Sequence, residues 1–282
     1  MKTVLITGAS SGFGYVTTLL LARKGYTVYA GVRNLEKKES LELQEIAKKE
    51  HLSLNVIQLD VTKQSHIDDL KKIADSIDIL INNAGIGFLG PTEEFTVEEV
   101  KDQFDINFFG VVRMIRAIVP SMRKKKRGMI INISSLNGLI SFPLYGVYSS
   151  SKFALETYSE SLRFELQPFN VKVALVEPGS FVTNFTKNKY FPQAQSDRNS
   201  PYISLTHHFF RIFKKFEDLK YNPLLYSFVS PDRIAERILA IIESSHPSLH
   251  NIVGIQAHSL VILNTILPRW IKNYLLRKAY RW

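Results

Sequence analysis

Short apolar runs alternate with longer stretches of helical periodicity along most of the chain. A parallel strand covered on both faces is apolar throughout, whereas a helix on a sheet is apolar at every third or fourth position. On this basis, strands are predicted at residues 3–7, 27–32, 54–59, 77–82, 128–134, 171–176 and 251–257. Helices are predicted between them, among others at residues 13–24, 96–122 and 151–167.

This alternation predicts an α/β fold built on one doubly wound, parallel β-sheet. Consecutive parallel strands need right-handed helical crossovers, which place helices on both faces of the sheet. Neither an internal repeat nor a low-complexity linker interrupts the pattern. A single domain over residues 1–282 is therefore expected.

One segment, residues 181–230, departs from the alternation. It precedes the last predicted strand and carries twelve aromatic residues: Phe181, Phe185, Tyr190, Phe191, Tyr202, Phe209, Phe210, Phe213, Phe216, Tyr221, Tyr226 and Phe228. An aromatic-rich insertion is typical of a cover over an apolar ligand, although aromatic side chains also simply pack a loop on the body of a protein. We expect a substrate lid here.

Composition excludes several classes of site. The chain has 282 residues, 45% hydrophobic and 22% charged, which is ordinary for a globular protein. The absence of cysteine excludes disulfides, thiolate metal sites and cysteine nucleophiles. No metal site is expected, because the pair His207 and His208 lacks a third ligand in a recognisable motif.

The N-terminal apolar run is too short for a signal peptide, and no run approaches the ~20 residues of a membrane span, so a cytoplasmic location is expected.

The formal net charge is +10, and basic residues concentrate in two places. The run 123–127 precedes Gly128 and is interpreted as a solvated helix end rather than a nucleic-acid site, since no nucleic-acid-binding motif accompanies it. The tail 260–282 mixes Leu, Ile, Trp and Tyr with basic residues, and no acidic residue follows Glu243. It predicts a basic amphipathic segment that contacts an anionic membrane surface, or that packs on its own protein or a second subunit. The basic residues are Arg269, Lys272, Arg277, Lys278 and Arg281.

A glycine-rich turn joins the first predicted strand to the first predicted helix. In such a unit, glycines let the backbone approach a dinucleotide pyrophosphate, and the helix N-terminus attracts the anion. A purely structural turn is the alternative, which the strand–turn–helix context disfavours. The candidate cofactor-binding residues are Gly8, Ser10, Ser11, Gly12, Phe13 and Gly14.

The end of the second strand bears on the choice between NAD and NADP. A carboxylate at this position accepts hydrogen bonds from ribose hydroxyls, but this chain has Arg33, whose guanidinium can pair with a 2′-phosphate. NADP(H) is therefore favoured over NAD(H). An arginine that is merely exposed on a loop, with Glu36 close by, is the alternative.

Tyr148 and Lys152 form a candidate acid/base pair. Residues four apart on a helix share a face. A free tyrosine has a pKa of about 10, and a nearby ammonium favours the phenolate and lowers that pKa. A lowered pKa suits general acid/base catalysis. An exposed pair would contribute only a few tenths of a kcal/mol of helix stability.

Together these residues resemble the classical short-chain dehydrogenase/reductase family over nearly the whole chain. The stretch from Phe142 to Glu156 is nearest to its 17β-hydroxysteroid and retinol dehydrogenase branch. The resemblance implies a Rossmann fold. It is carried by Thr7-Gly8-x-x-x-Gly12-x-Gly14, Asn82-Asn83-Ala84-Gly85, Asn107, Ser135, Tyr148-x-x-x-Lys152 and Pro178-Gly179.

The resemblance implies an oxidoreductase that transfers hydride between a nicotinamide and a carbonyl or secondary alcohol. Tyr148 would act as general acid/base, and Lys152 would lower its pKa and bind the nicotinamide ribose. Ser135 would hydrogen-bond the substrate oxygen, and Asn107 would hold a water in a proton relay. The further cofactor contacts implied are Asp60, Val61, Asn83, Ala84, Gly85, Pro178, Gly179, Phe181 and Thr183.

Family resemblance also implies a homodimer or homotetramer. The aromatic lid favours a bulky apolar substrate, such as a steroid, a retinoid, or a fatty or aromatic carbonyl compound. Two other functions compete. One is a cofactor-binding regulatory protein without turnover, which the four intact catalytic positions oppose. The other is an extended-type nucleotide-sugar epimerase or dehydratase, which the glycine spacing and the compact length oppose.

Overall fold

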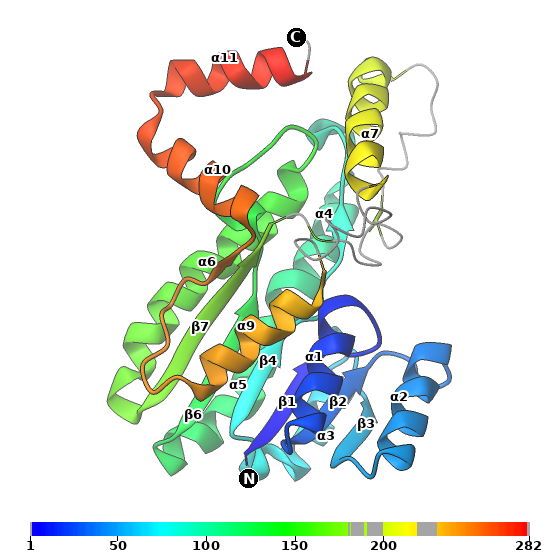
Figure 1. Ribbon diagram of the computed structural model, residues 1–282, viewed down its shortest axis with the longest axis vertical. Helices are drawn as coiled ribbons and strands as arrows, with labels where there is room; N and C mark the ends of the chain where they lie inside the picture. The colour runs from blue at the N-terminus through cyan, green and yellow to red at the C-terminus, as the bar shows by residue number, and fades with distance from the viewer. Residues whose placement is uncertain (1, 180, 182–188, 191–199, 219–229, 281–282) are drawn as a thin grey trace.

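The described residues build a seven-stranded parallel sheet in the order β3-β2-β1-β4-β6-β7-β9 (Figure 1). The computed structural model describes residues 2–179, 181, 189–190, 200–218 and 230–280. The sheet and its strand order confirm the predicted doubly wound α/β fold. The strands are β1 (Thr3–Thr7), β2 (Thr27–Val32), β3 (Leu54–Gln58), β4 (Ile79–Asn82), β6 (Gly128–Ile133), β7 (Val171–Pro178) and β9 (Ile252–Val253).

Two hydrophobic cores lie on opposite faces of this sheet. Successive side chains of a strand point to opposite faces, so Val4 and Ile6 of β1 enter one core while Leu5 enters the other. Helices α1 (Gly12–Arg23), α2 (Lys38–Lys49) and α9 (Asp232–Glu243) cover the first face. Helices α3 (Gln64–Asp69), α5 (Gly110–Lys125) and α6 (Gly146–Leu166) cover the second. Burial on both faces explains why the strands are apolar throughout.

The strand order reverses between β1 and β4, which are hydrogen-bonded neighbours. Crossovers run in opposite directions from this point, which in open α/β sheets marks a crevice outside the carboxyl ends of the strands. Ligands of open α/β sheets bind in such a crevice. The glycine-rich turn follows β1 and Asn83 follows β4, so the fold brings these two motifs together.

The predicted helix 96–122 is divided into three parts. Helix α4 (Val97–Phe104) begins at a capping box formed by Thr96 and Glu99. A π-helical turn over Asp105–Phe109 follows, and α5 begins at Gly110. Arg113 of α5 contacts the Asp105 carboxylate at 2.5 Å and its carbonyl oxygen at 3.3 Å, which stabilises the wider turn. Turns of this kind are frequent at functional sites.

Two other predicted boundaries differ from the structure by more residues than the usual uncertainty at the end of a helix or strand. The helix predicted at 151–167 begins five residues earlier, at Gly146, so Tyr148 lies in its first turn. The strand predicted at 251–257 is only β9, because Gly254 adopts φ +111° and α10 (Ile255–Ile266) starts directly afterwards. A positive φ of this size is disfavoured for residues other than glycine and breaks the strand.

The C-terminal tail forms two helices, α10 and α11 (Arg269–Tyr280), which project from the carboxyl edge of the sheet (Figure 1). Helix α11 contacts α7 (Ile203–Asp218), which belongs to the predicted lid segment. A short strand pair, β5 (Gly87–Phe88) with β8 (Lys189–Tyr190), links that segment to the loop after β4. The rest of the predicted lid, residues 182–188, 191–199 and 219–229, lies outside the described residues.

Candidate active site

The turn after β1 has a shape that requires glycine. Gly8 adopts φ +67°, and a Cβ placed there would lie 2.9 Å from the Ala84 Cα. At Gly14, a Cβ would lie 2.4 Å from both the Asn83 Nδ2 and the Gly8 carbonyl oxygen. Real side chains do not tolerate such contacts with backbone, so the glycines permit the close packing of the turn on helix α1 and on the loop after β4.

Thr7 joins the ends of β1 and β4. Its hydroxyl oxygen accepts hydrogen bonds from the backbone N–H groups of Asn83 and Ala84, both at 3.0 Å. In return, the Asn83 side chain donates to the carbonyl oxygens of Thr7 at 2.9 Å and Gly8 at 3.1 Å. Four hydrogen bonds therefore hold the glycine-rich turn against the loop that carries Asn83, Ala84 and Gly85.

The N-terminus of α1 fits a dinucleotide pyrophosphate. Ser11 occupies the N-cap position without a side-chain capping bond, and the first turn contains no acidic residue. The N–H groups of this turn are therefore available to an anion, which the helix dipole also attracts. Phe13 of α1 meets Phe181 edge to face, with ring centroids 5.8 Å apart. This contact brings together two predicted cofactor residues that are distant in sequence.

The remaining predicted cofactor residues border the same edge of the sheet. Arg33 is exposed after β2 and close enough to Asp60 to act on it electrostatically. Burial alone would raise the pKa of Asp60, but hydrogen bonds from Thr62 and the charge of Arg33 bring it below its ordinary value. Val61 is buried against Gly110. Gly179 donates its N–H to the Val253 carbonyl oxygen at 2.9 Å after Pro178, and Thr183 lies outside the described residues.

Tyr148 and Ser135 are hydrogen-bonded partners in a nearly dry environment. Tyr148 is only 6% exposed. Burial raises its pKa to about 12, against the opposing effect of the hydrogen bond with Ser135. The expected lowering by Lys152 is absent: the ammonium lies 5.9 Å from the ring centroid, and burial dominates. Tyr148 therefore holds its proton at neutral pH.

Lys152 is buried beside Tyr148 and donates to the Ile133 carbonyl oxygen at 2.8 Å. Burial lowers the pKa of Lys152 to about 8, although the negative charge of Glu156 opposes the shift. A lysine with this pKa exchanges its proton near physiological pH, whereas an ordinary surface lysine does not.

Asn107 lies inside the π-helical turn and is buried. Its Oδ1 accepts from the Ile86 N–H at 2.9 Å, and its Nδ2 donates to the Ile86 carbonyl oxygen at 3.0 Å and to the Ser151 hydroxyl at 3.1 Å. Gly85 separates it from Lys152: a Cβ on Gly85 would lie 3.4 Å from the Asn107 Oδ1 and 3.8 Å from the Lys152 Nζ. The fold thus brings Asn107, Ser135, Tyr148 and Lys152 to one edge of the sheet.

The sequence profile of the short chain dehydrogenase family matches residues 2–193 of this chain. The chain belongs to the short-chain dehydrogenase family. With the family, its assignment as an NAD(P)-dependent oxidoreductase is confirmed, and so is the predicted resemblance.

Known relatives span almost the whole of this short-chain dehydrogenase. A 3-ketodihydrosphingosine reductase from Bacteroides thetaiotaomicron is 38% identical, over 98% of this chain and 97% of its own length. Retinol dehydrogenase 8 from Homo sapiens is 37% identical, over 94% of this chain and 85% of its own length. The crystal structure of a short-chain dehydrogenase from Streptomyces avermitilis superposes with a TM-score of 0.80 at 31% identity, covering 99% and 98% of the two chains.

Part of the aromatic segment packs beside Tyr148 of the short-chain dehydrogenase. Phe209 of α7 joins Tyr148, Leu89 and Leu144 in one buried apolar cluster. Its ring meets that of Tyr145 edge to face, with centroids 5.6 Å apart. The described part of the segment therefore supplies an apolar wall next to the Tyr148 hydroxyl.

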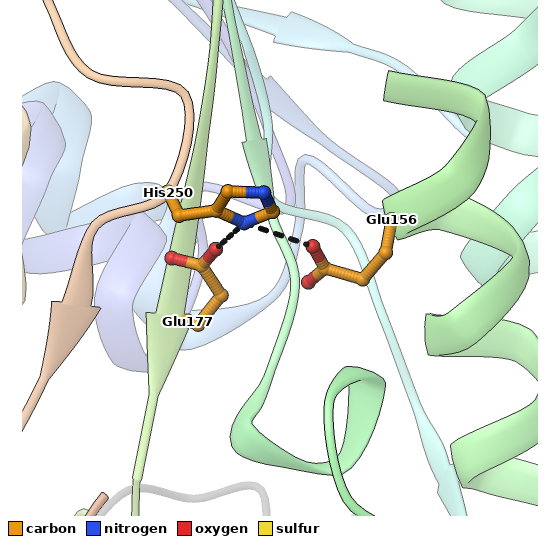
Figure 2. Close-up of side chains that lie close together, drawn as sticks. All are labelled: Glu156, Glu177 and His250. Atoms are coloured by element: carbon orange, nitrogen blue, oxygen red, sulfur yellow. Dashed lines mark hydrogen bonds and ion pairs between the residues drawn. The ribbon is translucent and has the colours of Figure 1, made fainter. Parts of the chain in front are cut away.

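Sequence reasoning missed a group of three residues behind Lys152: Glu156, Glu177 and His250 (Figure 2). From the sequence, only the position of Glu156 near Lys152 could have been predicted, since the two residues are four apart on one helix. Glu177 and His250 are 73 positions apart, and no local pattern connects them.

Replacing Thr7 by valine should destabilise the short-chain dehydrogenase by about 2 kcal/mol, because two backbone N–H groups lose their buried acceptor. Dinucleotide affinity should fall as well, since only the two hydrogen bonds from the Asn83 side chain would still join the turn to the Asn83 loop. Urea unfolding and fluorescence titration with NADPH and NADH measure the two effects.

Thr17→Val is the matched control. The Thr17 hydroxyl is equally buried but has no hydrogen-bond partner among the described residues. Its removal should change stability by less than about 0.5 kcal/mol. Equal effects of the two substitutions would show that the Thr7 hydrogen bonds do not hold the site together.

Proposed function

We propose that this short-chain dehydrogenase interconverts a bulky, apolar carbonyl compound and the corresponding alcohol, with Tyr148 as the general acid/base. The observation that carries the proposal is the buried, hydrogen-bonded pair of Tyr148 and Ser135 beside Lys152, at the sheet edge that also carries the glycine-rich turn. The regulatory alternative requires no such pair, and the glycine spacing and the compact length oppose the epimerase alternative.

The chemistry divides between the dinucleotide and the side chains. The bound nicotinamide supplies or accepts the hydride. In reduction, the Tyr148 hydroxyl donates its proton to the carbonyl oxygen of the substrate, and Ser135 hydrogen-bonds the same oxygen as negative charge develops there. Because burial keeps Tyr148 protonated, this proton is in place at neutral pH. Lys152 offsets the charge of the phenolate that forms, and Asn107 holds the loop at Ile86 and a water that leads to solvent.

A long-chain lipid carbonyl is the substrate class we favour. The two relatives described above are named for a sphingoid ketone and for retinol, both of which combine a polar end with a long apolar chain. In this chain, Leu89, Leu144 and Phe209 surround Tyr148 with apolar surface. A polar reacting group at Tyr148 with an apolar chain along this wall matches both observations.

The preference for NADP(H) rests on Arg33. Arg33 is exposed at the end of β2, where a 2′-phosphate would lie, and its charge also acts on Asp60 at the neighbouring strand end. Among structural neighbours, one from Burkholderia cenocepacia (25% identical, TM-score 0.73) is in complex with NADP. Another from Burkholderia phymatum (21% identical, TM-score 0.77) is in complex with NAD, so the family alone does not decide.

Helices α10 and α11 are proposed to dock on an anionic membrane surface. Their apolar side chains face outward: Ile266 and Trp270 are each 71% exposed. Basic residues of α11 lie among them, and no acidic residue is present beyond Glu243. No helix in the described part of the chain has the length and apolarity to cross a bilayer. Contact with the surface would give the site access to a lipid substrate from a cytoplasmic location.

A separate surface is proposed for self-association into a homodimer or homotetramer. Phe109, the last residue of the π-helical turn before α5, and Phe153 and Phe164 on α6 are exposed. These helices lie side by side on one face of the sheet, so pairing of two copies would cover the three rings.

Tyr148→Phe should abolish turnover while dinucleotide binding persists, because the substitution removes the hydroxyl that donates the proton and leaves the ring in place. Reduction of 3-ketodihydrosphingosine and of retinal, followed by nicotinamide absorbance, is the measurement. Tyr158→Phe on the same helix is the control and should retain activity. If the Tyr148→Phe variant lacked turnover but still fulfilled the function of the protein in the cell, the regulatory alternative would be favoured instead.

Arg33→Ala should weaken NADPH binding about tenfold or more, with little change for NADH, because the removed charge pairs only with the 2′-phosphate. Calorimetric titration with both dinucleotides tests this expectation. A wild-type protein that prefers NADH would contradict it.

Wild-type protein should sediment with vesicles that contain phosphatidylserine and not with pure phosphatidylcholine, and high salt should weaken the binding. The double substitution Ile266→Glu and Trp270→Glu, or deletion of residues 268–282, should abolish it. Val97→Glu on exposed α4 is the control. If the double variant becomes monomeric while wild type never binds vesicles, the two helices serve an interface between copies.

A further inference from the structure

Glu156 lies one helical turn from Lys152 on the same face of α6, and both side chains are buried. A carboxylate and an ammonium this close in a low-dielectric environment influence each other strongly. Accordingly, burial lowers the pKa of Lys152, and the negative charge of Glu156 partly offsets this lowering. Lys152 would lose its proton more readily without this neighbour.

His250 connects Glu156 to solvent. Its ring lies between two carboxylates that approach from different elements, Glu156 from α6 and Glu177 from β7 (Figure 2). The Nδ1 of His250 is 2.8 Å from a Glu177 oxygen and 3.6 Å from a Glu156 oxygen. On the outer side, its Nε2 is 3.3 Å from Glu160, and the His250 side chain is 39% exposed.

The charge of this cluster varies in the neutral pH range. Burial, and after it the charge of Glu177, raise the pKa of Glu156 to about 7. Burial also raises the pKa of Glu177. For His250, burial lowers the pKa, but the hydrogen bond with Glu177 and the two carboxylate charges outweigh it and raise the pKa overall. Each carboxylate therefore depends on the imidazolium for its negative charge.

A protonated His250 suits this cluster better than a bound metal ion does. Ligand atoms of Glu156, Glu177 and His250 lie within 4.8 Å of one another, which matches a cation site in spacing. However, one Glu177 oxygen already faces the His250 Nδ1, and the other accepts from the Asn251 N–H at 2.7 Å. A cation would have to displace the first of these contacts.

We propose that Glu156 is a positioning residue that keeps Lys152 in its ammonium form, and that His250 and Glu177 control the charge of Glu156. The charged groups that face Glu156 are Lys152 on α6, Glu177 on β7 and His250 before β9, while Glu160 acts on it only through His250. The proposal rests on the proposed role of Lys152 for its catalytic meaning. The coupling itself is a property of the protein without substrate or dinucleotide.

The test is a pH titration of the Lys152 side chain by NMR on protein with 13C-labelled lysine and without dinucleotide. The signal is assigned by its absence in Lys152→Met. In Glu156→Gln, the titration midpoint of Lys152 should fall by about one pH unit, because the neutral amide no longer stabilises the ammonium. Glu165→Gln, at an exposed position of the same helix, is the control and should leave the midpoint unchanged.

His250→Asn provides an independent variant at a partly exposed position, which keeps the test decisive if Glu156→Gln does not fold. Loss of the imidazolium makes Glu156 less charged, so the Lys152 midpoint should fall, by less than in Glu156→Gln. The alkaline limb of the kcat/KM profile should move in the same direction. A folded variant whose Lys152 midpoint equals that of wild type overturns the proposal, and this result does not depend on whether Tyr148 proves catalytic.

Discussion

The hydrogen bonds between Thr7 and the loop after β4 are the constraint on which the site depends. They join the two strand ends at the point where the strand order reverses, and therefore fix the glycine-rich turn relative to Asn83, Ala84 and Gly85. Gly85 in turn lies between Asn107 and Lys152. One buried hydroxyl thus links the expected pyrophosphate site to the residues proposed for proton transfer, although Thr7 itself has no proposed part in the chemistry.

Burial then determines the electrostatics of the site. Tyr148 and Lys152 are both removed from water, and both shift toward their neutral forms, the phenol upward and the ammonium downward in pKa. Tyr148 therefore keeps the proton that it would donate, and Lys152, with a pKa of about 8, is still mostly an ammonium at neutral pH and could offset the charge of a phenolate. Behind Lys152, the charges of Glu156, Glu177 and His250 act on one another. The charge state next to Lys152 therefore depends on groups from α6, β7 and the segment before β9.

Much of this arrangement could be predicted from the sequence, because its signals are local. Apolar runs mark the strands, and glycines mark the turn after β1, since only glycine allows its backbone approach there. The π-helical turn gave no such signal: it depends on Arg113 reaching back to Asp105 and on Asn107 binding Ile86. Likewise, the pKa of Tyr148 follows from a burial that only the packed fold provides.

The cluster behind Lys152 was invisible for the same reason. His250 reaches Glu177 across 73 positions, and in sequence both residues look like ordinary surface polar groups. Such contacts arise where a crossover connection returns to the sheet, and a pattern of neighbouring residues cannot reveal them.

The π-helical turn also has a consequence for helix register. An α-helix advances by about 100° per residue, so the additional residue of one wide turn rotates everything that follows by roughly that angle. Helix α5 therefore presents Met114, Ile118 and Met122 to the sheet. In a continuous α-helix from α4 onward, these three side chains would point in a different direction. The number of residues between Thr96 and Gly110 thus determines which side of α5 faces the sheet.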